Sequence, residues 1–273
     1  MIAMRKTLRF SLRTLLFFLL LLCLLILLML NPQIVYAKKH SYRQLTIYSK
    51  YEYPEVYNHV LDKALALVQQ SELYRPDLKL DLFLNDGNGA SVKFVLKKVF
   101  GNAFAWGYHN NVILNGHTDD SLKWVSISGY RRYLPGLIAH EMIHCYQLNR
   151  LGLYKASPFG NIPVWKREGY AEYICYKSAF KNEEQVLTDA VKKYKNENNK
   201  DSFPGATVTI DEGESYAGRD YYRFWILVKY LCDIRKFSFD ELIKTRLTEE
   251  EVYRELLNWY NDQPLVISPP STP

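Results

Sequence analysis

The stretch His140-Glu141-Met142-Ile143-His144 is the strongest indication of fold and chemistry in this 273-residue chain. Residues four positions apart lie on the same face of an α-helix, so the imidazoles of His140 and His144 can bind one metal ion. Glu141 is displaced by about 100° around such a helix. Its carboxylate is therefore directed beside the metal rather than onto it, where a general base for a metal-bound water is needed.

The residues around this stretch predict a largely buried helix. Pro135 suits its first turn, and Gly152 is placed to end it after Arg150. The flanking positions are mostly apolar, namely Leu134, Leu137, Ile138, Met142, Ile143 and Leu148. A solvated helix with two surface histidines is the alternative interpretation, and the apolar flanks disfavour it because a buried active-site helix needs such neighbours.

Two histidines leave the site short of one ligand, because catalytic zinc usually has three protein ligands and an open fourth position. A candidate lies in Trp165-Lys166-Arg167-Glu168-Gly169-Tyr170-Ala171-Glu172-Tyr173. Its carboxylates at Glu168 and Glu172 are four residues apart and share one face of a predicted helix. By itself this pair is more typical of a solvated amphipathic helix than of a metal site.

Together, the two stretches resemble the gluzincin metallopeptidases, the clan of thermolysin-like and aminopeptidase-N-like enzymes. In that clan a glutamate on a second helix, often within W-x-x-E-G-x-A, completes the zinc site. The resemblance implies that Zn²⁺ is held by His140, His144 and Glu168. It also implies that Glu172 orients a zinc-bound histidine, since such a partner fixes the tautomer of the imidazole. The matched motifs cover residues 130–231.

A third stretch, Tyr221-Tyr222-Arg223-Phe224-Trp225, resembles the later helix of these enzymes. The first tyrosine of that helix donates a hydrogen bond to the oxyanion of the tetrahedral intermediate, which implies this role for Tyr221. The chain has 22 tyrosines, so Tyr216 and Tyr222 remain competitors, and packing in the core is the alternative for each.

Residues 1–37 predict a targeting segment. Four basic residues open it: Arg5, Lys6, Arg9 and Arg13. An unbroken apolar run from Leu15 to Leu30 follows, and Val35-Tyr36-Ala37 offers small residues to a signal peptidase. The run is long for a signal peptide but short of the roughly 20 residues of a spanning helix. A signal peptide cleaved after Ala37 and an uncleaved membrane anchor both remain open. In either case the positive-inside rule places the following residues outside the cytoplasm, as a secreted or membrane-anchored protein.

Residues 38–263 have the length of one enzyme domain. The expected class is α+β with a thermolysin-like or gluzincin-like arrangement, in which a β-sheet lobe with helices precedes a mainly helical lobe. Residues 264–273 predict a disordered tail. The formal net charge of +6 includes the four basic residues of the leader and is about +2 without them, so the composition does not indicate a nucleic-acid partner.

Local patterns predict the elements of this domain. Strands are expected at 45–49 and, half-buried, at 78–84, with a hairpin over 104–114 that turns at 109–111. A helix is expected to open at Pro54, and residues 203–218 are expected to form a loop. Ser238 and Thr248 are placed to begin two C-terminal helices.

The resemblance assigns an edge strand that binds extended peptide to part of 103–114. The aminopeptidase motif G-x-M-E-N has no counterpart there, since 101–107 contains no carboxylate, so aminopeptidase activity is not implied. His109 and His117 are expected in solvated loops. Three cysteines, Cys145, Cys175 and Cys232, follow the leader and do not form a disulfide scaffold; free thiols are expected, although a pairing between the first two is open.

The sequence therefore predicts an extracytoplasmic zinc-dependent hydrolase, most consistent with a metallopeptidase in which Glu141 deprotonates a zinc-activated water and the substrate is a peptide or protein. Two alternatives remain. One is a membrane-tethered, non-catalytic binding or scaffold protein on a metallopeptidase fold, and the other is a zinc hydrolase that acts on a non-peptide amide. Structural zinc is usually closed by four protein ligands, so an open position beside Glu141 favours an enzyme.

Overall fold

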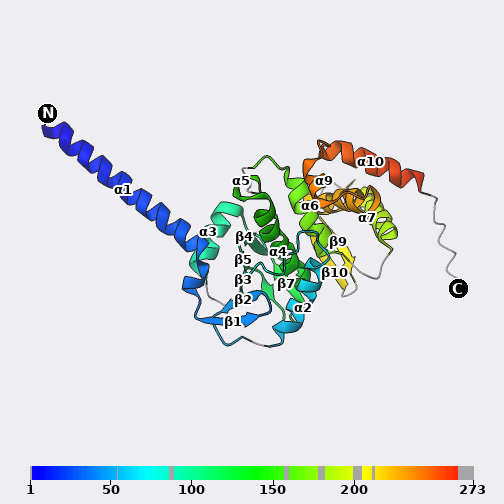
Figure 1. Cartoon of the computed structure of the whole chain (residues 1–273), viewed down its shortest axis with the longest axis horizontal. Coiled ribbons are helices and arrows are strands. Elements are labelled where there is room, and N and C mark those ends of the chain that lie inside the picture. Colours follow the sequence, from blue (N-terminus) through cyan, green and yellow to red (C-terminus); the bar gives the residue numbers. More distant parts are fainter. Residues whose placement is uncertain are drawn as a thin grey trace.

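The computed structural model describes residues 2–53, 55–85, 89–156, 160–177, 182–198, 205–210 and 213–263. The chain is mixed α+β, and an apolar helix at its N-terminus projects away from the remaining elements (Figure 1). Pro54 and the tail 264–273, which was predicted to be disordered, lie outside the described residues. The helix predicted to open at Pro54 is present and begins at Tyr57.

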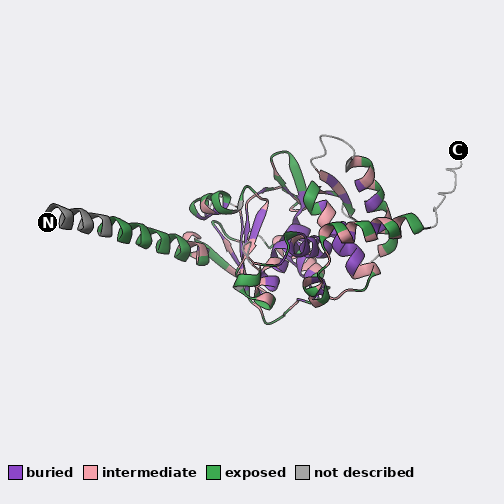
Figure 2. Cartoon of the chain, turned by 90° about the horizontal axis from the view of Figure 1, so that it is seen from above, coloured by how far each residue is buried: buried purple, intermediate pink, exposed green. Residues whose placement is uncertain are grey.

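The projecting helix α1 spans Ile2–Leu30. Its segment Arg13–Leu30 has a mean hydropathy of 2.8 with no residue buried, and is long and apolar enough to cross a membrane. A short 3₁₀ helix, η1 (Pro32–Val35), joins it to the first strand. Figure 2 shows most of the described part of α1 exposed, with Leu28 and Met29 of its last turn half-buried, whereas buried residues concentrate where the other helices and the strands meet.

A five-stranded sheet follows, in the order β1-β2-β3-β5-β4. Its strands are β1 (Lys38–Tyr42), β2 (Leu45–Ser49), β3 (Leu80–Phe83), β4 (Ala105–Tyr108) and β5 (Asn111–Leu114). The three central strands β2, β3 and β5 are parallel, while β1 and β4 are antiparallel to their neighbours. The predicted strand at 45–49 and the hairpin over 104–114 are confirmed.

Helices cover both faces of this sheet. On one face, α2 (Tyr57–Val68) and α4 (Leu134–Leu151) share the main core with Leu80 and Leu82 of β3. On the other face, α3 (Ala90–Phe100) packs against Phe83. The predicted strand at 78–84 is therefore present over Leu80–Phe83, but the prediction that it is half-buried was wrong, because β3 is a central parallel strand with both faces covered.

Two small β-units lie outside this sheet. The first has the order β6-β7-β8, from β6 (His117–Thr118), β7 (Trp124–Ile127) and β8 (Tyr130–Tyr133). The second is a pair of antiparallel strands, β9 (Gly205–Ile210) and β10 (Gly213–Gly218). The predicted loop at 203–218 was wrong over these strands. Ala206 and Val208 alternate with more exposed threonines, and this period of two is typical of a strand.

The rest of the chain is helical. Its elements are α5 (Leu153–Ala156), α6 (Val164–Cys175), α7 (Glu183–Asn198), α8 (Arg219–Lys229), a π-helical turn (Tyr230–Ile234), α9 (Phe239–Lys244) and α10 (Glu249–Asp262). Ser238 and Thr248 cap α9 and α10 through complete capping boxes, as predicted. Because α6 packs between α4 and α8, residues of all three helices can meet at one site.

Candidate metal centre

The helix that carries the H-E-x-x-H stretch is almost entirely buried. Pro135 lies in the first turn of α4 and Gly152 follows its last residue, Leu151, one residue beyond the predicted end. His140 is 3% exposed and Glu141 is 6% exposed. Both side chains are therefore held away from bulk water, which excludes the alternative of a solvated surface helix.

Three side-chain atoms that can bind a metal lie close together, two from α4 and one from α6. Nε2 of His140 and Nε2 of His144 lie 3.0 Å apart. Oε2 of Glu168, on α6, lies 3.6 Å from Nε2 of His140 and 3.1 Å from Nε2 of His144. The structure thus brings together the three residues that the sequence predicted as ligands.

These separations fit a metal ion. In a tetrahedral zinc site, metal–ligand distances of about 2.0–2.2 Å place ligand atoms about 3.3 Å apart. The three separations range from 3.0 to 3.6 Å. Two imidazole nitrogens and one carboxylate are also the donor set that zinc takes in catalytic sites. His140, His144 and Glu168 therefore have both the spacing and the chemistry for Zn²⁺.

Two glycines allow this convergence. A Cβ at Gly169, next to Glu168, would lie 2.6 Å from the carbonyl oxygen of Phe224, so α6 and α8 approach each other closely only with glycine there. A Cβ at Gly107 would lie 2.3 Å from the carbonyl oxygen of Glu141, so the edge strand β4 can lie directly against α4.

Glu141 lies beside the two histidines but farther from them than Glu168. One carboxylate oxygen of Glu141 lies within 4.8 Å of a ring nitrogen of His140 and of His144. Glu168 is closer to both imidazoles and shares a single oxygen between them. The Glu141 carboxylate is therefore left available to a water or substrate group at the site.

The orientation of His144 is set by a residue that sequence reasoning missed. Nδ1 of His144 lies 3.1 Å from Oε1 of Gln147, while Nε2 of Gln147 donates to the carbonyl oxygen of Arg167 at 2.9 Å. Because the amide nitrogen is used by that carbonyl, Oε1 must accept from Nδ1–H of His144. This tautomer leaves the lone pair of Nε2 free for a metal. Gln147 lies three residues after His144 on the same helix, and this spacing was the signal in the sequence that could have identified it.

Glu172, which was predicted to orient a histidine ligand, lies beside His140 and is paired with an unexpected arginine. Oε1 of Glu172 lies 3.4 Å from Nδ1 of His140, which is buried and makes no hydrogen bond. Nη2 of Arg132, on β8, donates to both carboxylate oxygens of Glu172 at 2.8 and 2.9 Å. Glu172 is fully buried, so Arg132 supplies the cation that keeps this carboxylate compensated next to the histidine. No pattern in the sequence indicated Arg132.

Charge within the site shifts the pKa values of two predicted ligands in opposite directions. Burial lowers the pKa of His144, but the Glu168 carboxylate outweighs this and raises that pKa to about 9. Burial raises the pKa of Glu168, while the two imidazoles outweigh it and hold that pKa well below its usual range. The negative charge of Glu168 and the positive charge of His144 therefore stabilise each other in the metal-free protein.

Among the three candidate tyrosines, Tyr221 lies closest to the predicted ligands. Its ring centroid is 6.4 Å from that of His140, and the Glu168 carboxylate and burial raise the pKa of its phenol. Tyr222 is buried in the core and donates to the carbonyl oxygen of Ala190. Tyr216 stacks on Tyr130 at 4.2 Å.

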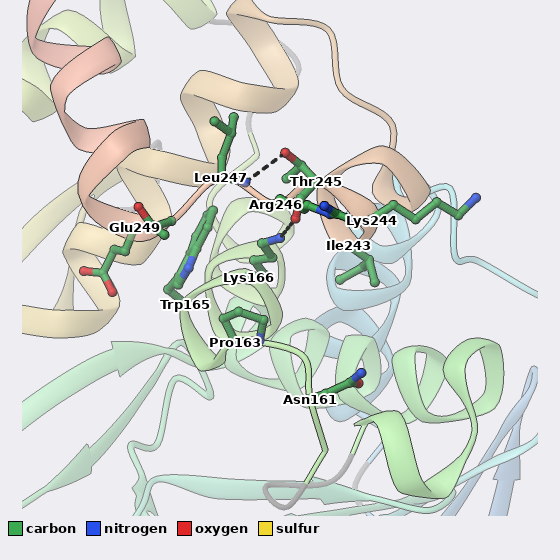
Figure 3. A pocket seen from close by; sticks show the side chains of 11 residues that line it. Asn161, Pro163, Trp165, Lys166, Ile243, Lys244, Thr245, Arg246, Leu247 and Glu249 are labelled. Carbon is green, nitrogen blue, oxygen red and sulfur yellow. Dashed lines mark hydrogen bonds between the residues drawn. The ribbon is translucent and has the colours of Figure 1, made fainter.

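One hollow in the described part of the chain lies away from the candidate metal centre. It has a volume of about 530 Å³ and lies between α6 and the segment that joins α9 to α10 (Figure 3). Lys166 lines it, and its ammonium group donates to the carbonyl oxygen of Thr245 at 2.6 Å. Lys166 is two residues from Glu168, or about 200° around the helix, so this hollow lies on the opposite side of α6.

The other predicted positions take no part in this cluster. Cys145 and Cys175 are buried free thiols, as expected, and burial raises the pKa of each. His109 is exposed in the turn between β4 and β5, while His117 is exposed in the short strand β6 rather than in a loop.

In comparisons with known proteins, no family model matches the chain and no match is found among curated proteins. These comparisons therefore identify neither a metal nor a reaction, and both are proposed from the residues at the site.

Proposed function

We propose that this protein is a zinc-dependent hydrolase of the gluzincin type, and specifically a metallopeptidase. The observation that carries the proposal is the convergence of Nε2 of His140, Nε2 of His144 and Oε2 of Glu168 to within 3.6 Å of one another beside Glu141. A closed structural site would need a fourth protein ligand, whereas three ligands and a nearby carboxylate suit catalysis.

Each residue has a chemical role in this proposal. Zinc, when bound, supplies a Lewis acid that activates water and polarises a carbonyl group. Glu141 accepts a proton from the attacking water and returns it to the leaving amine. Tyr221 donates a hydrogen bond to the oxygen on which negative charge develops. Gln147 and Glu172 hold the imidazoles in the orientation that presents Nε2.

The surrounding elements support a peptide substrate. β4 lies at the end of the five-stranded sheet and, among the described strands, pairs only with β5. It lies against α4 at Glu141 because Gly107 has no side chain. An extended peptide could add to this edge through main-chain hydrogen bonds. Residues 38–263 would then form one gluzincin-like catalytic domain, with the sheet before the helical lobe.

The location follows from α1. We propose that Arg13–Leu30 crosses a membrane and that the catalytic domain lies on the extracytoplasmic side, since the basic residues precede the apolar segment.

The test is metal content and hydrolysis with the full chain purified in detergent. We expect about one zinc per chain in the parent protein, and Glu168→Ala should lose most of it while an exposed control, Glu55→Ala, keeps it. Glu141→Gln should keep zinc and lose hydrolysis of peptides in a panel that also contains non-peptide amides. Absence of zinc from the folded parent supplied with the metal would overturn the metal centre. Full hydrolysis by zinc-loaded Glu141→Gln would overturn the mechanism.

A further inference from the structure

The last turns of α1 are built into the folded domain. Leu28 and Met29 pack against a cluster on the far face of the sheet. The buried members of this cluster are Phe83, Val92, Leu96, Trp106 and Ile113. The hydroxyl of Tyr108, at the end of β4, also donates to the carbonyl oxygen of Met29 at 2.8 Å. The end of the apolar helix is therefore in contact with both β4 and the cluster that holds α3.

The connection from α1 to the domain is packed as well. Pro32 is buried, and the ring of Tyr36 lies 5.0 Å from that of Phe83. Val35 packs against the same cluster. Cleavage after Ala37 would remove all these contacts from the core, which indicates that α1 is retained as an anchor rather than removed as a signal peptide.

Beside this anchor, α3 presents an unusual outward face. Val92 and Leu96 point into the cluster, while Phe94 and Val99 are 63% and 59% exposed. Lys97 and Lys98 are also exposed, and the helix contains no acidic residue. Apolar side chains interleaved with lysines are typical of a helix that lies in the headgroup region of a bilayer.

Exposed apolar side chains gather around the end of α1. Outside α1, the large aliphatic and phenyl side chains that are exposed in the described part of the chain are Ile34, Val56, Phe94, Val99 and Val164. Three of these five belong to η1 and α3. Both elements lie next to the last turns of α1 (Figure 1), so these side chains are placed where a membrane crossed by α1 would begin.

We propose that α3 lies on the surface of the membrane that α1 crosses and contacts anionic lipids. Phe94 and Val99 enter the headgroup region, and Lys97 and Lys98 pair with lipid phosphates. This inference rests on the proposed membrane crossing by α1 but not on the zinc chemistry. Two attachments, α1 and α3, would fix the orientation of the domain, and β4 would hold the metal centre at a constant height because it contacts both Met29 and Glu141.

The test uses the full chain in vesicles of mixed phosphatidylglycerol and phosphatidylcholine. A nitroxide label is placed on Val99→Cys, in a chain in which Cys23 and Cys232 are replaced by serine. Asn258→Cys, on the exposed face of α10 at the other end of the molecule, is the matched control. In a separate chain that keeps Cys23 and has only Cys232 replaced by serine, a label on Cys23 reports on α1. Collision rates with oxygen, which dissolves in lipid, and with a water-soluble nickel chelate are measured for each.

We expect the label at 99 to collide several-fold less often with nickel and several-fold more often with oxygen than the label at 258. Lys97→Glu/Lys98→Glu should reverse this difference. If the label at 99 is as accessible to nickel as the label at 258 while the label on Cys23 is shielded, the contact of α3 with the membrane is overturned. The membrane crossing by α1 would still hold. An intact mass showing loss of residues 1–37 in cells would overturn both. Zinc content is measured on the same samples, so that loss of the proposed metal site can be distinguished from loss of the membrane contact.

Discussion

Oε2 of Glu168 lies 3.1 Å from Nε2 of His144, although the two residues belong to different helices. The contact exists because α6 packs against α4 on one side and, at Gly169, approaches α8 closely on the other. One carboxylate oxygen is thereby shared by two imidazoles, and the same packing brings Tyr221 of α8 to the site. The chemistry proposed for this protein depends on that three-helix arrangement.

Gln147→Leu should weaken zinc binding by about 10–100-fold. The variant removes the acceptor for Nδ1–H of His144, so the tautomer that presents Nε2 is no longer favoured. Competition with a chelator measures the affinity. Gln70→Leu, an exposed glutamine after α2, serves as the control and should bind zinc like the parent. Unchanged affinity in Gln147→Leu would show that the hydrogen bond does not orient the ligand.

Tyr221→Phe should keep zinc and lower kcat by about 10²–10³-fold, because one donor to the developing oxyanion is lost. Tyr222→Phe is the matched control on the same helix. It loses only a hydrogen bond in the core, worth about 1 kcal/mol of stability, and should keep kcat. Kinetics on a peptide cleaved by the parent separate the two variants. Equal kcat in Tyr221→Phe and the parent would remove Tyr221 from the mechanism.

Arg132→Met should destabilise the fold by about 3–5 kcal/mol, because it leaves the buried carboxylate of Glu172 without its cation. Replacing both partners, as in Arg132→Met/Glu172→Met, should recover much of this loss, since no uncompensated charge is then buried. Chemical denaturation of the metal-free chain in detergent gives the free energies. If the double variant were no more stable than Arg132→Met, the uncompensated charge of Glu172 would not be the cause of the lost stability.

Zinc affinity should rise with pH until about pH 9 and then level off. His144 must be neutral to bind a metal, and Glu168 raises its pKa to about 9 in the metal-free chain after opposing the effect of burial. Below that pH, binding displaces this proton, so the apparent association constant changes by up to about tenfold per pH unit. Chelator competition between about pH 7 and pH 10 measures the slope.

The raised pKa of His144 should also make the metal-free fold less stable as pH rises, whereas zinc affinity increases with pH. Because the folded pKa of His144 lies above its unfolded value of about 6.5, its pairing with Glu168 stabilises the metal-free fold fully below that value. This contribution is lost as pH rises through about 9. Glu168→Gln, which lacks the charge, should show neither dependence over this range, and a parent whose zinc affinity is flat from about pH 7 to pH 9 would contradict the pairing.

Local patterns were sufficient for features that depend on neighbours in the chain. The helix of His140 and His144, the caps at Ser238 and Thr248, and the hairpin over 104–114 all follow from helical periodicity, side-chain capping or turn chemistry. The loop predicted at 203–218 was wrong because β9 and β10 are short, rich in glycine and polar residues, and stabilised by packing against β8 and α8.

By itself the sequence determined the apolar N-terminal helix, the mixed α+β class and the spacing of His140, Glu141 and His144, because each is set by composition or by the period of one helix. Only the tertiary structure decided that Glu168 reaches both histidines, that Tyr221 rather than Tyr222 lies beside them, and that Arg132 neutralises Glu172. Those contacts join residues of separate elements, and which side chains meet depends on how closely the helices and strands pack.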